Sequence, residues 1–183
     1  MVVSRYEFKV IMTADEIKRS LIRISSQIVE WAGGIYNLAL IGIYRGGAHL
    51  ARRVKEIIEE KEKIEIPFGV IDITLYRDDL SETLTMPEIH STDINFDISG
   101  KKIVLVDDVI YTGRTVRAAI DQIIDFGRPH SIALAVLIDR GHRELPIQPD
   151  FVGRKVPTSR DERVEVELIE DGLKDQVIIG KKA

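Results

Sequence analysis

The segment Ile103–Thr115 carries the residues whose types and spacing are best suited to chemistry. It reads Ile-Val-Leu-Val-Asp-Asp-Val-Ile-Tyr-Thr-Gly-Arg-Thr. An apolar run leads into two adjacent carboxylates, Asp107 and Asp108, and a Thr-Gly-Arg-Thr turn then opens a segment with helical periodicity. The first backbone N–H groups of a helix lack helical partners and, with the helix dipole, favour an anion. The pattern therefore predicts an anion site in the turn.

The two carboxylates and the turn suit opposite ends of one ligand. Asp107 and Asp108 would repel a phosphate, but ionised carboxylates accept strong hydrogen bonds from the neighbouring hydroxyls of a ribose. Gly113 allows the backbone to approach a phosphate closely, and Arg114 adds positive charge at the rim. The segment therefore favours a ribose 5-phosphate, held by its hydroxyls at one end and by its phosphate at the other.

The same residues permit other interpretations. Two Asp residues after a strand could simply cap a loop. Receiver domains hold Mg²⁺ with acidic residues at strand ends, but no Thr-Gly-Arg-Thr turn follows them there. A P-loop is excluded, because the sequence contains no Gly-x-x-x-x-Gly-Lys.

Strands and helices alternate along the chain in an order that would position this turn. Apolar residues at helical spacing predict a helix that opens at Thr13 and ends at Gly33, and a charged helix runs from Arg45 to about Glu62. The predicted strands are 38–43, 68–76, 103–106, 132–138, 164–168 and 177–179, a third helix covers 116–126, and 139–159 is an excursion on the surface. We expect one α/β domain over 1–183, with an open, mostly parallel sheet and helices on both faces. Ligands of such sheets lie beyond the carboxyl ends of the strands.

Composition excludes several classes of protein. The net charge of −4, from 26 Lys plus Arg and 30 Asp plus Glu, limits nucleic-acid binding to a local basic face. There is no Cys, which excludes disulfides, thiolate catalysis and Cys-ligated metals, and the four His are not at metal-ligand spacing. The apolar runs fall far short of the ~20 residues that a membrane span needs. We therefore expect a soluble, cytoplasmic protein with no membrane partner.

The segment Ile103–Thr115 resembles the phosphoribosyl pyrophosphate (PRPP) signature of type I phosphoribosyltransferases, and the similarity extends over most of the chain. Asp72–Leu80 and Asp139–Ile147 resemble one subfamily, the pyrimidine operon attenuation regulators that are also uracil phosphoribosyltransferases. The resemblance implies a flexible lid loop at about 77–95 and a small hood at about 140–160. It implies transfer of phosphoribose from PRPP to uracil, which yields UMP and pyrophosphate. The transition state resembles an oxocarbenium ion, so catalysis rests on alignment of sugar, base and Mg²⁺-pyrophosphate.

The resemblance also implies roles for single residues. Asp107 and Asp108 would hold the ribose hydroxyls. Mg²⁺ would be held mainly by PRPP, with Asp107, Asp108 or Asp139 in contact through water. The implied catalytic residues are Asp107, Asp108, Tyr111 and Arg77, and the 5-phosphate and nucleotide would contact Val109, Ile110, Tyr111, Thr112, Gly113, Arg114 and Thr115.

Position 111 bears on the choice of base. Purine-salvage relatives carry an Asp there, often assigned as the general base, whereas this chain has Tyr111. Tyrosine has an ordinary pKa near 10 and suits that role poorly. The pyrimidine subfamily also carries Tyr, so the residue favours uracil and leaves the base catalyst unnamed. Arg45-Gly46-Gly47 looks more like the purine enzymes, so a hypoxanthine, guanine or xanthine phosphoribosyltransferase is the alternative, as is a regulator without significant catalysis.

Two further loops match the family. Tyr44, Arg45, Gly46 and Gly47 correspond to its pyrophosphate loop, where relatives often hold a cis peptide, expected here at Tyr44–Arg45. Arg45 would contact pyrophosphate oxygens; the alternative is a solvated turn residue. Arg77 begins the lid and would contact pyrophosphate on closure. The charges of the lid equally fit a solvated loop.

The remaining assignments concern the base and RNA. Arg140, Phe151, Val152 and Val156 would line the base in the hood, although Phe151 and Val152 suit core packing equally well. The subfamily is a homodimer or higher oligomer that binds an operon mRNA hairpin, switched by UMP or UTP. Its RNA face would use Arg23, His142, Arg143 and Arg154, with Arg23 and Arg143 open to a solubilising role instead. Ser26, Trp31 and Gln148 stand where relatives more often carry basic or His residues, which leaves open whether RNA binding is retained.

Overall fold

The computed structural model describes residues 6–73 and 92–182. The predicted lid up to residue 91, its Arg77 and the end of the strand predicted to reach Tyr76 lie outside the described residues. Among the helices of the described part, none is long and apolar enough to cross a membrane.

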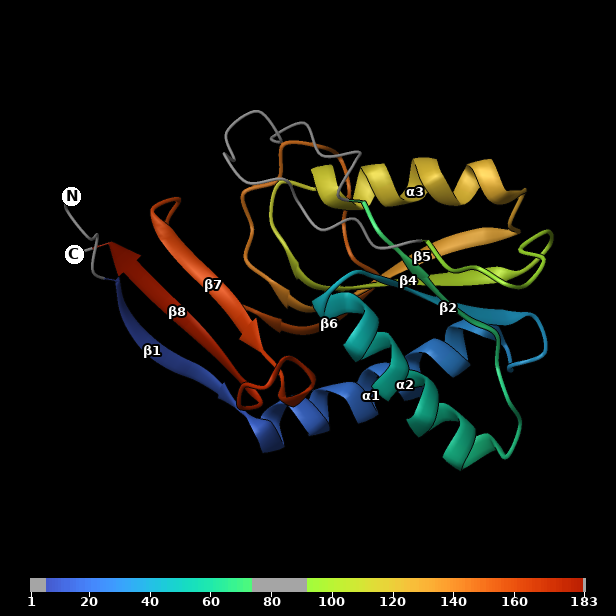
Figure 1. Ribbon diagram of the computed structural model, residues 1–183, viewed down its shortest axis with the longest axis horizontal. Helices are drawn as coiled ribbons and strands as arrows, with labels where there is room; N and C mark the ends of the chain where they lie inside the picture. The colour runs from blue at the N-terminus through green and yellow to red at the C-terminus, as the bar shows by residue number, and fades with distance from the viewer. Residues whose placement is uncertain (1–5, 74–91, 183) are drawn as a thin grey trace.

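Five parallel strands form the central sheet (Figure 1). The prediction of an open, mostly parallel sheet is confirmed. In spatial order the strands are β3 (Phe68–Ile71), β2 (Leu38–Ile43), β4 (Lys102–Ile110), β5 (Ser131–Asp139) and β6 (Phe151–Lys155).

Helices cover both faces of this sheet, as predicted. Helices α1 (Ala14–Ala32) and α2 (Gly46–Glu62) pack on one face and α3 (Arg114–Phe126) on the other (Figure 1). Successive strand residues point to opposite faces, so Leu40 joins the core under α1 and α2 while Ile41 joins the core under α3. Burial on both faces explains why these strands read as continuous apolar runs.

The start and end of α1 follow from its sequence. The side chain of Thr13 accepts a hydrogen bond from the N–H of Glu16 at 3.4 Å, and Glu16 accepts one from the N–H of Thr13 at 2.9 Å. This capping box satisfies donors that lack helical partners. Gly33 ends the helix in the left-handed conformation, with φ of 67°.

The structure differs from the prediction in several strands, and β3 ends at Ile71, so Asp72 and Ile73 lie outside the strand predicted over 68–76. A second, antiparallel sheet has the order β1-β8-β7 and pairs an unpredicted β1 (Tyr6–Thr13) with β8 (Gln176–Lys182), beside β7 (Glu162–Glu167). The predicted surface excursion over 139–159 is wrong where it contains β6. That strand is short and lies at the sheet edge, so its Phe-Val-Gly-Arg-Lys sequence lacks the apolar run of a central strand. Strand β4 extends past its predicted end to Ile110.

Candidate active site

The predicted carboxylates, Asp107 and Asp108, lie near the end of β4, where the carboxyl ends of the parallel strands meet. Strand β4 pairs with β2 only as far as Val106, whereas its pairing with β5 continues to Ile110. Asp107 is buried, and its Oδ1 accepts the N–H of Asp108 at 3.0 Å. Oδ1 of Asp108 accepts the N–H of Val109 at 2.7 Å. Burial raises the pKa of Asp108, and the negative charge of Asp171 raises this pKa further.

The predicted pyrophosphate loop packs directly against these carboxylates. A Cβ on Gly46 would lie 2.4 Å from Oδ2 of Asp108, and one on Gly47 would lie 2.4 Å from the carbonyl oxygen of Val106. Only glycine permits this approach, because real Cβ atoms do not come so close to other heavy atoms. The Tyr44–Arg45 peptide is cis, as expected. The glycines therefore bring the β2–α2 loop and the end of β4 together.

The turn predicted to hold the 5-phosphate, Tyr111–Thr115 (the phosphate turn), follows β4, and α3 begins at Arg114, two residues before its predicted start at Val116. Gly113 has φ of 92°, a left-handed conformation that favours glycine, and Arg114 begins the helix. The N–H of Arg114 donates to the hydroxyl of Thr112 at 3.3 Å, and Thr115 lies in the first helical turn. Ile110, in contrast, has its side chain buried in the core under α3. The turn and the carboxylates of β4 thus lie at the same end of the sheet, where the parallel strands end.

The segment after β5 holds the turn in place. The N–H groups of Glu144 and Leu145 donate to the carbonyl oxygen of Thr112, at 2.9 and 3.2 Å. Nη1 of Arg143 donates to the carbonyl oxygen of Tyr111 at 2.9 Å. An exposed ion pair joins Nε of Arg114 to Glu144 at 2.9 Å. The backbone of the phosphate turn is therefore fixed by residues about thirty positions later in the chain.

Tyr111 contacts two basic side chains of the same segment. The guanidinium of Arg140 stands 4.1 Å from the centre of the Tyr111 ring, and the His142 ring meets it edge-on at 5.9 Å. Arg140 is buried and donates to the carbonyl oxygens of Ser159 and Glu162, at 3.1 and 2.7 Å. The predicted base residue Arg140 is thus held beside the predicted catalytic residue Tyr111 by a cation–π contact.

The other predicted base residues lie in different surroundings. Phe151 is buried in the core under α1, where its ring contacts Trp31 edge-on, with the ring centres 6.0 Å apart. Of its two predicted roles, its position fits core packing. Val156 also packs on this core, whereas Val152 packs on the core under α3 together with Ile147. The structure does not bring these three residues together.

The four residues assigned to RNA fall into two separate pairs. Arg23 on α1 is exposed and donates to the carbonyl oxygens of Val152 and Gly153 at 3.0 and 2.6 Å, and Arg154 on β6 donates to that of Ile11 on β1. His142 and Arg143 lie beside the phosphate turn instead. The interpretation of Arg143 as an exposed charge is wrong: its side chain is 11% exposed and pairs with Asp139 at 2.6 Å.

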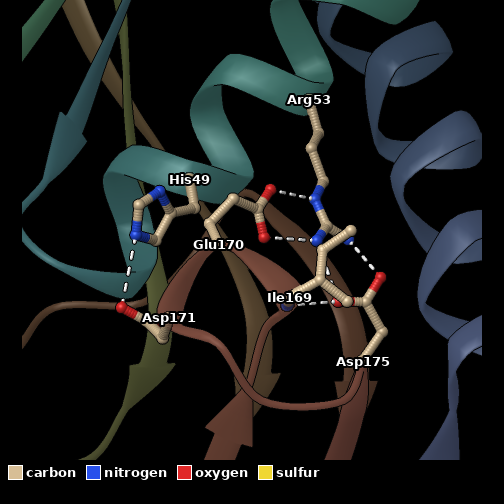
Figure 2. Close-up of polar contacts among 6 residues, drawn as sticks. All are labelled: His49, Arg53, Ile169, Glu170, Asp171 and Asp175. Atoms are coloured by element: carbon tan, nitrogen blue, oxygen red, sulfur yellow. Dashed lines mark hydrogen bonds and ion pairs between the residues drawn. The ribbon is translucent and has the colours of Figure 1, made fainter.

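Sequence reasoning missed Asp171, which lies next to the predicted pyrophosphate loop. Its Oδ1 is 3.6 Å from Nη1 of Arg45 and 3.5 Å from Nε2 of His49 (Figure 2 shows the His49 contact). The side chain of Arg45 is 57% exposed. No local pattern links Asp171 to Arg45, since 126 positions separate them.

Comparisons with known proteins identify the family of this chain. The model of the phosphoribosyl transferase domain family matches residues 11–168. Bifunctional protein PyrR of Roseiflexus sp. (strain RS-1) is 58% identical over 172 residues, which cover 93% of this chain and 94% of that protein. Bifunctional protein PyrR of Listeria monocytogenes serotype 4b (strain F2365) is 57% identical over 176 residues, covering 94% of this chain and 96% of that protein.

Solved structures with the same fold include purine enzymes. A hypoxanthine-guanine phosphoribosyltransferase of Bacillus anthracis superposes with a TM-score of 0.71 at 18% identity, covering 97% of this chain and 99% of that one. The hypoxanthine phosphoribosyltransferase of Trypanosoma cruzi gives 0.71 at 17% identity, covering 96% and 97%. Such low identities show the fold alone. The family match and the near-full-length relatives lead to one conclusion: this chain belongs to the phosphoribosyltransferase family, within the group of the bifunctional PyrR proteins.

Proposed function

We propose that this protein is a uracil phosphoribosyltransferase that makes UMP and pyrophosphate from uracil and PRPP, and a uridine-nucleotide-responsive, RNA-binding regulator of pyrimidine operon attenuation. The observation that carries the enzymatic part is the contact of Gly46 and Gly47 with the end of β4, next to Asp107 and Asp108. It joins a loop suited to pyrophosphate and a pair of carboxylates suited to ribose. The relatives that are named bifunctional support two roles.

In this proposal the chain acts mainly by positioning and by charge. Asp107 and Asp108 accept hydrogen bonds from the ribose hydroxyls, the turn from Tyr111 holds the 5-phosphate, and Arg45 contacts the pyrophosphate. As the bond from C1′ to pyrophosphate breaks, positive charge develops on the sugar, and the nearby carboxylates stabilise it.

Magnesium fits the residues of this site. Adjacent carboxylate oxygens suit a hard cation that keeps most of its water, and a side chain at Gly46 would fill the space beside Asp108. Bound with PRPP, Mg²⁺ would neutralise the leaving pyrophosphate. Asp107 and Asp108 would hold it through water.

Arg140 and Tyr111 give a way to activate uracil without a carboxylate base. Position 111 offers a phenol and not a carboxylate, so no anionic base stands there. The guanidinium of Arg140, 4.1 Å from the ring, adds positive charge at this end of the site. Positive charge favours the deprotonated, anionic form of uracil as the nucleophile.

A base-selection assay tests the enzymatic proposal. The protein is incubated with PRPP, Mg²⁺ and, in separate reactions, uracil, hypoxanthine, guanine or xanthine, and the nucleotide products are measured. We expect UMP alone. A purine nucleotide without UMP would favour the purine alternative, which Arg45-Gly46-Gly47 and the fold neighbours suggest. Absence of turnover with every base, alongside tight binding of the operon hairpin, would leave only the regulator.

The RNA role predicts a changed salt dependence when an exposed arginine is removed. Arg23 lies on the exposed side of α1, and its replacement by Ala should lower the slope of log K against log salt by about one in a gel-shift titration with the operon hairpin. Arg117→Ala on α3 is the matched control, since that exposed arginine pairs with Asp121 and lies outside the assigned RNA face. An unchanged slope for Arg23→Ala would exclude a phosphate contact.

The chain is proposed to form a homodimer or a higher oligomer. Ile22 is the large hydrophobic side chain of α1 that is exposed, at 45%.

A further inference from the structure

Helix α2 presents a row of basic side chains to the loop between β7 and β8. The row consists of Arg45, which immediately precedes the helix, His49 and Arg53. Because they are four residues apart, they lie on the same face of α2. The facing loop contains the short 3-10 helix Ile169–Asp171, labelled η3, and carries three acidic residues. Figure 2 shows His49 and Arg53 directed toward these acids, which are Glu170, Asp171 and Asp175.

Arg53 binds two of the three acids and fixes the loop to the helix. Its Nε and Nη2 donate to the two carboxylate oxygens of Glu170 at 2.7 and 2.6 Å. Its Nη1 and Nη2 donate to the two oxygens of Asp175 at 2.7 and 2.9 Å, and Asp175 also accepts the N–H of Ile169 at 2.9 Å. We call Arg53, Glu170 and Asp175 the Arg53 cluster. Planar two-point contacts of this kind fix direction as well as distance.

The Arg53 cluster holds two carboxylates against one guanidinium and therefore carries a net negative charge. Its side chains are at most 31% exposed. Hydrogen bonds from Arg53 lower the pKa of Glu170 and of Asp175, so both carboxylates stay ionised against one guanidinium. The cluster therefore holds the loop at one place on α2.

Asp171 is the acid that this arrangement leaves for the pyrophosphate loop. Its side chain is 18% exposed and meets His49 and Arg45 at 3.5 and 3.6 Å. Its charge also reaches Asp108, since it is one of the causes that raise the pKa of that carboxyl. The carboxylate of Asp171 thus contacts the guanidinium of Arg45, the group that would bind an incoming pyrophosphate.

We propose that the Arg53 cluster positions Asp171 as the resident counter-ion of Arg45, and that Asp171 competes with pyrophosphate for this arginine and so limits its affinity. The inference rests on the proposed function, in which Arg45 binds pyrophosphate. Two effects act in the same direction: Asp171 occupies the guanidinium, and its charge repels an anion nearby. Asp171 therefore promotes release of the pyrophosphate product. Arg53, Glu170 and Asp175 are positioning residues, because they act through Asp171.

Titration of inorganic pyrophosphate by calorimetry, with and without Mg²⁺, tests the role of Asp171. We expect Asp171→Asn to bind pyrophosphate about two- to fivefold more tightly, the range of a partly exposed ion pair, and the gain to shrink at high salt. Glu165→Gln is the control: it makes the same change in charge on β7, where Glu165 pairs with Arg163 at 2.8 Å. Affinity that is unchanged, or weaker only with Mg²⁺, would overturn the counter-ion role.

A second variant tests the role of the Arg53 cluster. Arg53→Lys keeps the positive charge but cannot bind two carboxylates through planar pairs. In this background Asp171→Asn should change the affinity for pyrophosphate by less than twofold, because Asp171 is no longer held on Arg45. A gain as large as in the parent protein would overturn the positioning role.

The proposed function can fail separately from this inference. Arg45→Gln should weaken the binding of pyrophosphate. If it binds as the parent protein does, the assignment of the pyrophosphate loop itself is contradicted. If Arg45→Gln weakens binding and Asp171→Asn leaves it unchanged, only the counter-ion role is contradicted.

Discussion

Replacement of Asp108 by Asn is expected to lower kcat/KM for PRPP by about 10²- to 10³-fold, the cost of one preorganised charge at a reacting centre. The carboxylate would both accept a ribose hydroxyl and face the positive charge that develops on the sugar. Asn offers an acceptor of the same shape without the charge. Steady-state kinetics with uracil and varied PRPP measures the change.

The same substitution is expected to leave the fold at least as stable. Burial raises the pKa of Asp108, and a carboxyl with a raised pKa costs stability once it ionises. The free energy of unfolding of the parent protein should therefore fall as the pH rises through the folded-state pKa. Asp108→Asn should lack this fall, which urea unfolding between acid and neutral pH would measure.

Asp121→Asn serves as the matched control for Asp108→Asn. Asp121 lies on α3 and forms an exposed ion pair with Arg117 at 3.2 Å, so its loss should change neither kinetics nor stability appreciably. If Asp108→Asn unfolds more readily at neutral pH in step with its lost activity, Asp108 serves the fold and not the reaction.

Replacement of Arg143 by Met is expected to lower the free energy of unfolding by about 3–5 kcal/mol, because it leaves a buried carboxylate without its partner. Arg143 and Asp139 pair at 2.6 Å, and each side chain is 11% exposed. Arg143 also donates to the carbonyl oxygens of Tyr111 and Ile147, at 2.9 and 3.0 Å. The phosphate turn should loosen with it, which raises KM for PRPP.

A double variant separates the buried charge from the lost packing. Arg143→Met combined with Asp139→Asn should recover a large part of the lost stability, because no unpaired charge remains. Urea unfolding with unchanged m-values measures both variants. If Arg143→Met is as stable as the parent protein and loses only its salt-dependent RNA binding, this account is contradicted. Arg143 would then be an RNA-binding residue.

Some predicted site residues are recognised from their immediate sequence neighbours, and others depend on partners far away in the chain. Asp107, Asp108 and Gly113 lie within one contiguous segment, where a strand, a turn and a helix follow one another, and the structure places them together. Arg143 and Phe151 lie in a segment of Pro, Gly and charge, where a buried and an exposed arginine have the same appearance. Their partners, Asp139 and Trp31, become visible only in three dimensions.

From the sequence alone came the α/β class, the parallel sheet, the three helices and the phosphate turn, because apolar periodicity and a contiguous motif are local properties of the chain. The tertiary structure alone decided that β1 pairs with β8, that Gly46 lies against Asp108, and that Arg53 and Asp171 join the loop after β7 to α2. Contacts between residues more than sixty positions apart depend on how the elements pack, and a polar side chain does not reveal in its own sequence neighbourhood which partner it will contact.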